Sequence, residues 1–283
     1  MVSPSRRRDA VTYLSRRHRV SQRRACQLVG QHRSTQRYEG QPPDFELRLT
    51  KRMNELAAKH PRFGYRRIWA LLRSEGFEVN HKRVERLWRL EGHRVPPQRR
   101  THGQKAVGGS AFGTWAIQAG APNDVWSYDF VSARTDDGQQ LRILNVVDEF
   151  TRRCLGCRVA RNIGARDLID ELGSLFEQHG MPKRIRSDNG REFISETLAD
   201  WLKERHVEQL FIAKGSPQQN AYVERFNGSM RDEVLNGELF RTVLEAKVVL
   251  HAWVEQYNTV RPHRGLGFQT PQAFYTGIRV GSQ

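Results

Sequence analysis

Residues 125–160 read VWSYDFVSARTDDGQQLRILNVVDEFTRRCLGCRVA, and the distribution of apolar residues in this stretch decides the fold. Runs of bulky residues typical of strands occupy 125–131, 141–147 and 154–160. Asp-Asp-Gly at 136–138 is a hairpin turn signal between the first two runs. The stretch therefore predicts three successive strands, with a hairpin between the first and the second.

Helices and short strands alternate after this stretch. An apolar stripe predicts a helix over 165–179 that ends at Gly180. The remaining expected elements are a strand at 185–188, a helix at 196–205, a strand at 207–212, and helices from Pro217, capped by Ser216, and from Thr242. This order predicts an α/β fold in which helices cover a mixed sheet.

Basic charge is concentrated at the front of the chain. The 283 residues include 47 Lys and Arg against 31 Asp and Glu. Residues 1–105 hold 26 of the basic and 9 of the acidic side chains, a net charge of +17, whereas residues 106–283 have a net charge of −1. Such a surplus repels itself unless a polyanion screens it, so nucleic acid is the leading partner. The alternatives are a solvated cationic surface and a patch for anionic lipid.

Helix signals in the front half form two groups. Ser21 and Gly30 bracket one short helix and Ser34 begins another, which outlines a small helix-turn-helix. A second module begins with a helix at Asp44, and a Pro-, Gly- and Arg-rich linker follows it. The predicted domains are a helix-turn-helix at 1–40, a second such module at 41–94, a linker at 95–122, and the α/β domain with a C-terminal helical tail at 123–283.

The last helix of the second module carries an apolar stripe of Val84, Leu87 and Trp88 behind an Asn80 cap. Its outward side chains are His81, Lys82, Arg83, Arg86 and Arg89. A helix of this kind, after another helix and a short Gly-bearing turn, suits insertion into the DNA major groove. The alternative is an ordinary three-helix core with a solvated basic face.

Three acidic residues of the back half stand in chemically suggestive places. Asp129 interrupts a bulky strand, Asp188 ends a short strand in the string SDNG, and Glu224 lies on the helix from Pro217. Taken singly, an ion pair, a turn and a helix surface would explain them. If they converge, a divalent cation best offsets their repulsion, and the lack of a Cys or His cluster favours Mg²⁺ or Mn²⁺ over Zn²⁺.

The helix that carries Glu224 is expected to have two faces. Steps of three, four and seven residues place four side chains along one exposed polar stripe, namely Asn220, Glu224, Asn227 and Arg231. Tyr222, Phe226 and Met230 would form the face toward the sheet.

Cysteines and hydropathy exclude other classes. Three cysteines, Cys26, Cys154 and Cys157, are an odd number for a secreted disulfide framework. Cys154 and Cys157 form a CxxC on a predicted strand, where a spacing of three points the thiols to opposite faces and favours core packing over a metal or redox site. The chain has no apolar run long enough to span a membrane and no secretory signal pattern, so no membrane partner and a cytoplasmic location are expected.

Motifs over most of the chain resemble one family. Asp129, Asp188 and Glu224, with 35 residues between the last two, resemble the DDE triad of transposases and retroviral integrases. Arg231, seven positions after Glu224, and the strings SPQQNAYVERFNGSMRDE, YNTVRPH and FQTP are similar to OrfB-type transposases of the insertion-sequence-three family. The string HPRFGYRRIWALLRSEGFEVNHKRVERLW resembles the helix-turn-helix segment before their catalytic core.

The resemblance implies an RNase H-like, integrase-type catalytic core behind all-α helix-turn-helix DNA-binding modules. Asp129, Asp188 and Glu224 would be catalytic and hold two Mg²⁺ ions, with Mn²⁺ as a substitute. Arg231 would contact the DNA end, with Asn220 and Gln219 as its neighbours. The implied reaction is phosphoryl transfer without a covalent enzyme intermediate, in which strand cleavage at the ends of an insertion sequence precedes strand transfer.

The implied partners are double-stranded DNA, as terminal inverted repeats and target, further copies of this chain on that DNA, and an upstream-frame partner or fusion. The location would be nucleoid-associated. Retroviral integrases carry an N-terminal His/His/Cys/Cys zinc module, but Cys26 is the only cysteine in that part of this chain, so no zinc site is expected there. A non-cutting DNA-binding regulator or inhibitor of transposition is the alternative function, and a single-metal nuclease is a lesser alternative.

Overall fold

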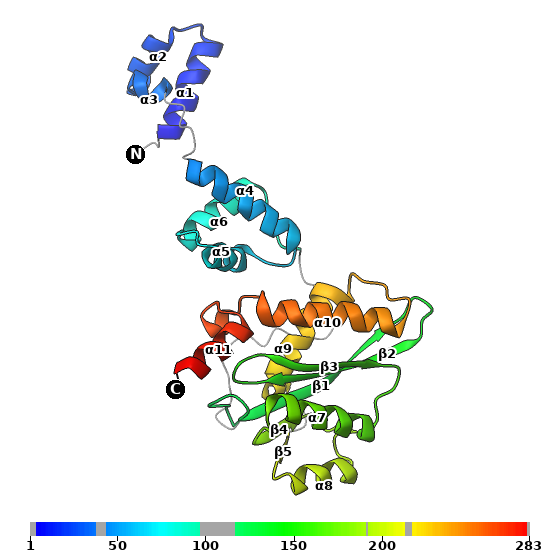
Figure 1. Ribbon diagram of the computed structural model, residues 1–283. Helices are drawn as coiled ribbons and strands as arrows, with labels where there is room; N and C mark the ends of the chain where they lie inside the picture. Colours follow the sequence, from blue (N-terminus) through cyan, green and yellow to red (C-terminus); the bar gives the residue numbers. More distant parts are fainter. Residues whose placement is uncertain (1–3, 38–43, 97–116, 191, 213–216, 282–283) are drawn as a thin grey trace. The chain divides into compact units, whose positions relative to one another are not determined.

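The computed structural model describes residues 4–37, 44–96, 117–190, 192–212 and 217–281, and the chain forms two compact units, 1–51 and 52–283 (Figure 1). The helices that lie in the first unit are α1 (Pro4–Arg17), α2 (Gln22–Val29) and α3 (Arg33–Arg37). Val11, Ala25 and Cys26 form their small core.

The predicted caps of α2 are confirmed. The Ser21 side chain accepts a hydrogen bond from the backbone N–H of Arg24, and Gly30 ends the helix with a left-handed φ of 66°. The sequence analysis did not predict α1. Its arginines are good helix formers, but its apolar contacts with α2, through Val11 and Leu14, are few, and a hydrogen bond from Arg7 Nη1 to the Gly30 carbonyl adds to them, so the sequence shows no clear apolar stripe.

Three helices, α4 (Asp44–Lys59), α5 (Tyr65–Ser74) and α6 (His81–Leu90), make the second helical module. Val84, Leu87 and Trp88 are buried, as predicted. The Asn80 side chain accepts a hydrogen bond from Lys82 N at 2.9 Å and so caps α6. Residues 97–116 of the predicted linker lie outside the described residues.

A five-stranded mixed sheet in the order β3-β2-β1-β4-β5 forms the centre of the back half. The strands are β1 (Val125–Arg134), β2 (Gln140–Asp148), β3 (Cys154–Ala160), β4 (Arg184–Ser187) and β5 (Glu208–Phe211). β1, β2 and β3 pair antiparallel, and β4 and β5 continue parallel to β1. The predicted hairpin turn is confirmed, since Gly138 has a φ of 80° and donates from its backbone N to Thr135.

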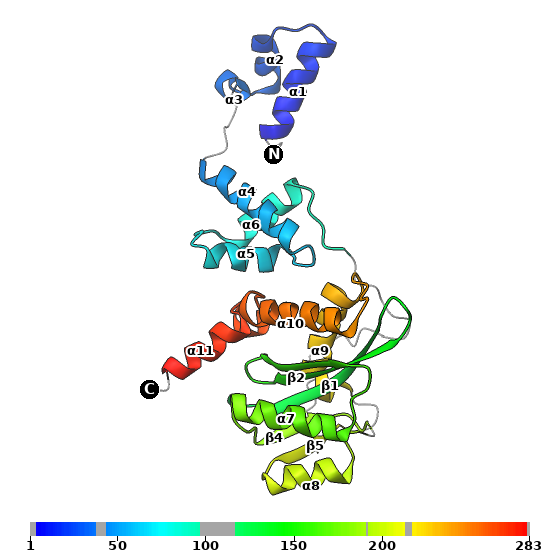
Figure 2. The same ribbon diagram turned by 45° about the vertical axis from the view of Figure 1, so that its right-hand side comes forward.

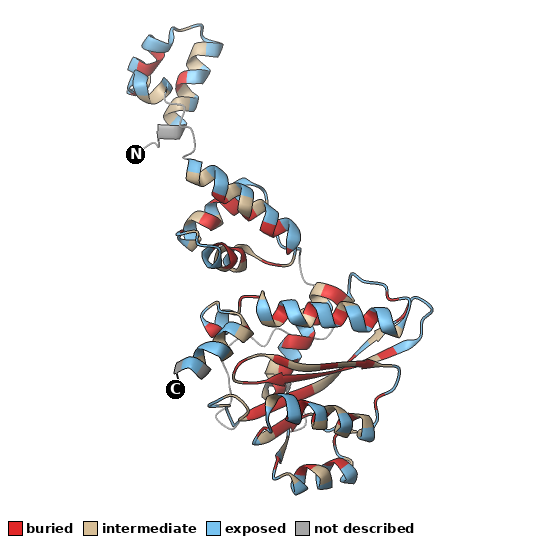
Figure 3. Ribbon diagram, in the orientation of Figure 1, coloured by how far each residue is buried: buried red, intermediate tan, exposed pale blue. Residues whose placement is uncertain are grey.

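Helices cover both faces of this sheet, and the burial follows that arrangement (Figures 2 and 3). α7 (Ala165–His179) and α8 (Glu196–Glu204) pack on one face; α9 (Ala221–Met230) and α10 (Val243–Thr259) pack on the other, and α11 (Pro271–Gly281) follows. The two faces bury separate apolar clusters. No helix of the described ranges combines the length and apolar character needed to cross a membrane.

The predicted orientation of the cysteines is wrong. Cys154 and Cys157 are both buried in the cluster under α9 and α10. A β-bulge explains this, because Val147 pairs with Cys154 whereas Val146 pairs with Gly156, which leaves Leu155 as an extra residue and returns both thiols to one face. Both cysteines are free, and burial raises the pKa of the Cys157 thiol to about 12.

Candidate active site

Two aspartates, Asp129 and Asp188, lie just beyond the end of the parallel pairing between β1 and β4. Val125–Ser127 pair with Arg184–Arg186, and this register, extended by two residues, places Asp188 opposite Asp129. Neighbouring strands are about 4.8 Å apart, so the two side chains start from adjacent backbone positions. The carboxyl end of a parallel pair is a common place for ligands, because the chains leave the sheet there.

Strand alternation turns Asp129 toward α9. Trp126 and Tyr128 belong to the cluster under α7, whereas Val131 belongs to the cluster under α9. Asp129 lies two residues before Val131, so its side chain points to the same face of the sheet. Its Oδ2 accepts a hydrogen bond from Asn227 Nδ2 of α9 at 2.9 Å. The strand thus presents one carboxylate to the helix that carries Glu224.

A relay of buried amides fixes that carboxylate. Asn145, the cross-strand partner of Asp129, donates from Nδ2 to Asn227 Oδ1 at 2.8 Å. Asn145 and Asn227 are 0% and 5% exposed. The Phe130 backbone N–H donates to the other Asp129 oxygen, Oδ1, at 2.8 Å. Both carboxylate oxygens of Asp129 are therefore oriented by groups within the fold.

Asp188 is held by its own turn. Its Oδ1 accepts a hydrogen bond from the Gly190 backbone N–H at 2.9 Å. A Cβ at Gly190 would lie 3.0 Å from that oxygen and 3.1 Å from the Phe193 ring, so a side chain there would require one of these groups to shift by a few tenths of an ångström. The SDNG string that marked Asp188 in the sequence also shapes its surroundings.

Electrostatic coupling joins the three acids through Asp129. Burial raises the pKa of Asp129, and the negative charge of Asp188 raises it further, whereas the positive charge of Arg231 lowers it. Burial likewise raises the pKa of Glu224, with the charge of Asp129 as the second cause. The repulsion that the sequence analysis expected of a converging triad is thus present on Asp129 and Glu224.

The predicted faces of the Glu224 helix need correction. Pro217–Asn220 form a 3₁₀ turn, and α9 begins only at Ala221; the predicted cap, Ser216, lies outside the described residues. Asn220 and Asn227 are buried, not exposed, while Glu224 and Arg231 are exposed. The prediction of an exposed polar stripe was wrong because packing against the sheet buries more of the surface of α9 than one apolar stripe suggests. The buried positions are Val223, Phe226, Asn227 and Met230.

α9 runs directly into a π-helical turn, Arg231–Leu235. Such turns insert one extra residue per turn, are rare and often mark functional sites. Asp232 pairs with Arg62, and Glu233 pairs with Arg261. The turn therefore ties the end of the Glu224 helix to the segment between α4 and α5 and to the end of α10.

The other predicted site residues are placed as follows. Lys82, Arg86 and Arg89 are exposed on α6, and His81 and Arg83 are half-buried. Arg89 pairs with Glu85 at 2.6 Å, and the His81 ring lies edge-on to Trp69. Gln219 is half-buried, and Asn220 is 2% exposed with an Oδ1 that accepts no hydrogen bond from the described residues. Burial places the Asn220 side chain inside the fold.

Sequence reasoning missed the function of Asn227 and Asn145. Asn145 interrupts the apolar run LRILNVV, and an amide in a central buried strand needs partners. That local signal could have pointed to Asn145, but only the packing of α9 on β1 and β2 identifies its partner.

Electrostatic coupling links Asp129 with Asp188 and Asp129 with Glu224. Among the described residues, no three His, Cys, Asp or Glu side chains lie close enough to hold one metal ion together. Asp129 is the shared member of both coupled pairs. All three side chains offer oxygen donors, which suit hard divalent cations.

Comparison with known proteins matches both the helical module and the sheet domain. Residues 44–101 match an HTH-like domain, residues 119–217 match an integrase core domain, and residues 205–271 match a second integrase core domain model. The predicted fold class, an integrase-type mixed-sheet core preceded by a helical, HTH-like region, is confirmed.

Curated relatives cover nearly the whole chain. The insertion element IS407 uncharacterized 31.7 kDa protein of Burkholderia multivorans is 39% identical over 261 residues, which are 90% of each chain. The insertion element IS476 uncharacterized 39.2 kDa protein of Xanthomonas euvesicatoria is 35% identical over 99% of this chain and 79% of its own length. The transposase for insertion sequence element IS904 of Lactococcus lactis is 27% identical over 80% of this chain and 92% of its own length. The chain therefore belongs to the insertion-sequence-three family of transposases, with an HTH-like module before an integrase core.

Proposed function

We propose that this transposase cleaves DNA strands at the ends of an insertion sequence and transfers them to a target, with Asp129, Asp188 and Glu224 as the catalytic carboxylates. The observation that carries the proposal is the coupling of Asp129 to both other acids across β1, β4 and α9. Carboxylates whose negative charges repel one another in a half-exposed position favour a bound cation, because a cation removes the repulsion.

The donor set fits Mg²⁺ or Mn²⁺. Asp129, Asp188 and Glu224 would hold the two ions. Bound ions of this kind supply charge stabilisation to the phosphoryl group and lower the pKa of an attacking water or 3′-OH. The chain itself orients the Asp129 carboxylate through the hydrogen bond from Asn227, and it places the positive charge of Arg231 nearby.

DNA capture is assigned to the helical modules. Lys82, Arg86 and Arg89, which are exposed on α6, would contact phosphates, and the Asn80 cap and the buried apolar stripe hold the helix. Two element ends must be processed together, so we expect further copies of the chain on the same DNA.

The full chain should nick a duplex that carries one end of its element. We expect nicks when Mg²⁺ or Mn²⁺ is present and none when EDTA removes the metal, because phosphoryl transfer here depends on the ions for charge stabilisation. Labelled strands on a denaturing gel report the cut. Binding without any cut in either metal would contradict the enzyme and favour a non-cutting regulator.

Asn227→Ala should slow nicking by about 10- to 100-fold, because losing a partner that orients a metal ligand has an effect of that order. The measurement is the initial rate against metal concentration, and the half-saturating metal concentration should rise, an effect that mere loss of folded protein would not produce. Asn236→Ala, an exposed asparagine past the π-helical turn, is the matched control and should nick at the parent rate. An unchanged metal requirement in Asn227→Ala would refute the orienting role.

A further inference from the structure

A second basic feature lies beside α9 and has no part in the reaction described above. It is a cavity of about 620 Å³ within the second unit, lined by the start of α5, by β2 and the turn after it, by α9, and by the segment after α10. Its basic lining residues are Arg66, Arg67, Arg152, Arg225, His263 and Arg264. The described lining contains no Asp or Glu.

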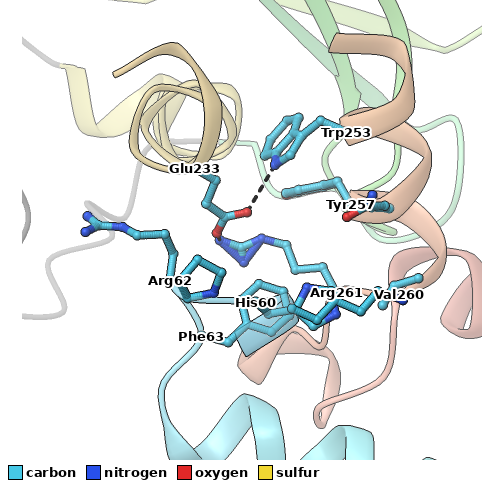
Figure 4. Close-up of a pocket in the computed structure, with 11 residues that line it drawn as sticks. His60, Arg62, Phe63, Glu233, Trp253, Tyr257, Val260 and Arg261 are labelled. Carbon is cyan, nitrogen blue, oxygen red and sulfur yellow. Dashed lines mark hydrogen bonds and ion pairs between the residues drawn. The ribbon is translucent and has the colours of Figure 1, made fainter. Parts of the chain in front are cut away.

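Glu233, in an adjoining pocket, interacts with two arginines, Arg67 and Arg261. Figure 4 shows it in the adjoining pocket, where it accepts hydrogen bonds from Trp253 Nε1 at 3.1 Å and from Arg261 Nη2 at 2.5 Å. Glu233 Oε1 also lies 3.8 Å from Arg67 Nη1. One negative charge is thus divided between Arg67 and Arg261.

Arg66, Arg225 and Arg264 are exposed, and none of them forms an ion pair with a carboxylate of the described residues. Arg152 is half-buried, with its guanidinium 3.7 Å from the centre of the Tyr222 ring. The Arg152 Nη1 also donates to the Glu149 backbone carbonyl, and its charge interacts with the buried Glu149 carboxylate, so the uncompensated positive charge of the cavity comes from Arg66, Arg225 and Arg264. The cavity therefore presents several fixed positive charges to solvent.

His263 gives independent evidence of this positive potential. Burial lowers its pKa to about 3, and the charges of Arg261, Arg67 and Arg152 contribute to the shift. Its Nε2 is buried and has no hydrogen-bond partner in the described part of the chain. Burial and the surrounding positive charges therefore hold the His263 imidazole neutral.

The location of the cavity indicates which kind of anion it binds. Tyr222 and Arg225 line the cavity, and Glu224 lies between them in sequence on α9. A helix with its side chains is about 10–12 Å across, so the cavity lies within one helix width of the catalytic glutamate. An open, arginine-lined cavity there matches an extended polyanion, since guanidinium groups fork onto phosphate oxygens.

We propose that this cavity binds the sugar-phosphate backbone of a DNA strand beside the acidic triad. The identity of the polyanion as DNA rests on the proposed function. Phosphate contacts position a duplex without reading its sequence, so the cavity would hold element ends and target DNA alike.

The test measures DNA binding in the full chain carrying Asp188→Asn, so that cleavage does not interfere. Fluorescence anisotropy of a labelled duplex is followed from about 50 to 300 mM salt for Arg225→Gln, Arg264→Gln and the double variant. Each lost phosphate contact should lower the slope of log K against log salt by about 0.9, and the double variant should bind about tenfold more weakly near 100 mM salt. The loss should be equal for an element end and for an unrelated duplex.

Arg166→Gln is the matched control, because Arg166 is an exposed arginine on α7, across the sheet from α9. Its slope should equal that of the parent. If the double variant also keeps the parent slope while the wild-type chain nicks DNA, the cavity proposal is refuted and the proposed function stands. If the weaker binding is confined to the element end, base contacts replace phosphate contacts and the proposal is likewise overturned.

Discussion

Asp188→Asn should lower the rate of metal-dependent nicking by about 10³-fold while the protein stays folded. Loss of a carboxylate ligand removes several kcal/mol of transition-state charge stabilisation, and about 4 kcal/mol corresponds to that factor. The amide oxygen of asparagine can still accept the Gly190 N–H bond that shapes the turn. The fold and the site's shape should therefore survive, and only the charge is lost.

Initial nicking rates at saturating Mg²⁺ measure the effect, with circular dichroism as the check on folding. Asp200→Asn removes an equivalent charge from an exposed position of α8 and should leave the rate unchanged. Glu224→Gln should match the Asp188 variant, since Glu224 is exposed and its packing contribution is small. Nicking by folded Asp188→Asn at the wild-type rate would remove Asp188 from the catalytic site.

Arg186→Met should destabilise the protein by about 3–5 kcal/mol, because it leaves a buried carboxylate without its cation. Arg186 Nη1 lies 2.8 Å from both oxygens of Glu149, and the two side chains are 6% and 0% exposed. Burial raises the pKa of Glu149 to about 7 even though the charge of Arg186 lowers it, so the ionised carboxylate depends on that arginine. Thermal unfolding should show a Tm lower by roughly 10 °C.

Two variants separate charge from packing in that experiment. Arg184→Met, in the same strand, removes a more exposed arginine paired with Asp124 and Glu208, and should cost about 0–1 kcal/mol. The double variant Arg186→Met, Glu149→Leu removes both charges and should recover much of the lost stability. A double variant no more stable than Arg186→Met would show that lost packing, and not the unpaired charge, causes the damage.

Local chemistry explains the parts of the fold that could be predicted. Ser21, Asn80 and Thr242 cap helices with their own side chains, and each acts on backbone N–H groups within three residues. Strand runs and the 136–138 turn depend equally on near neighbours. Asp129 and Asp188 could be marked because a carboxylate in a bulky strand, or at its end, is conspicuous in sequence.

Long-range contacts explain the parts that could not. The β-bulge at Leu155 arises from the register of β3 on β2, and it reverses the direction of one thiol. The burial of Asn227 follows from contacts 82 and 98 residues away in the chain, with Asn145 and Asp129. No periodicity within the α9 sequence carries that information.

The amino-acid sequence alone determined the order of elements, the basic front half and the residue types of the acidic triad, because these follow from composition and from interactions over a few residues. The tertiary structure decided which amides aim Asp129, how the bulge packs both thiols on one face, and which arginines line the cavity beside α9. Those outcomes depend on strand register and on helix packing between distant segments, where the free energy of burying a polar group is balanced only by partners that the fold brings together.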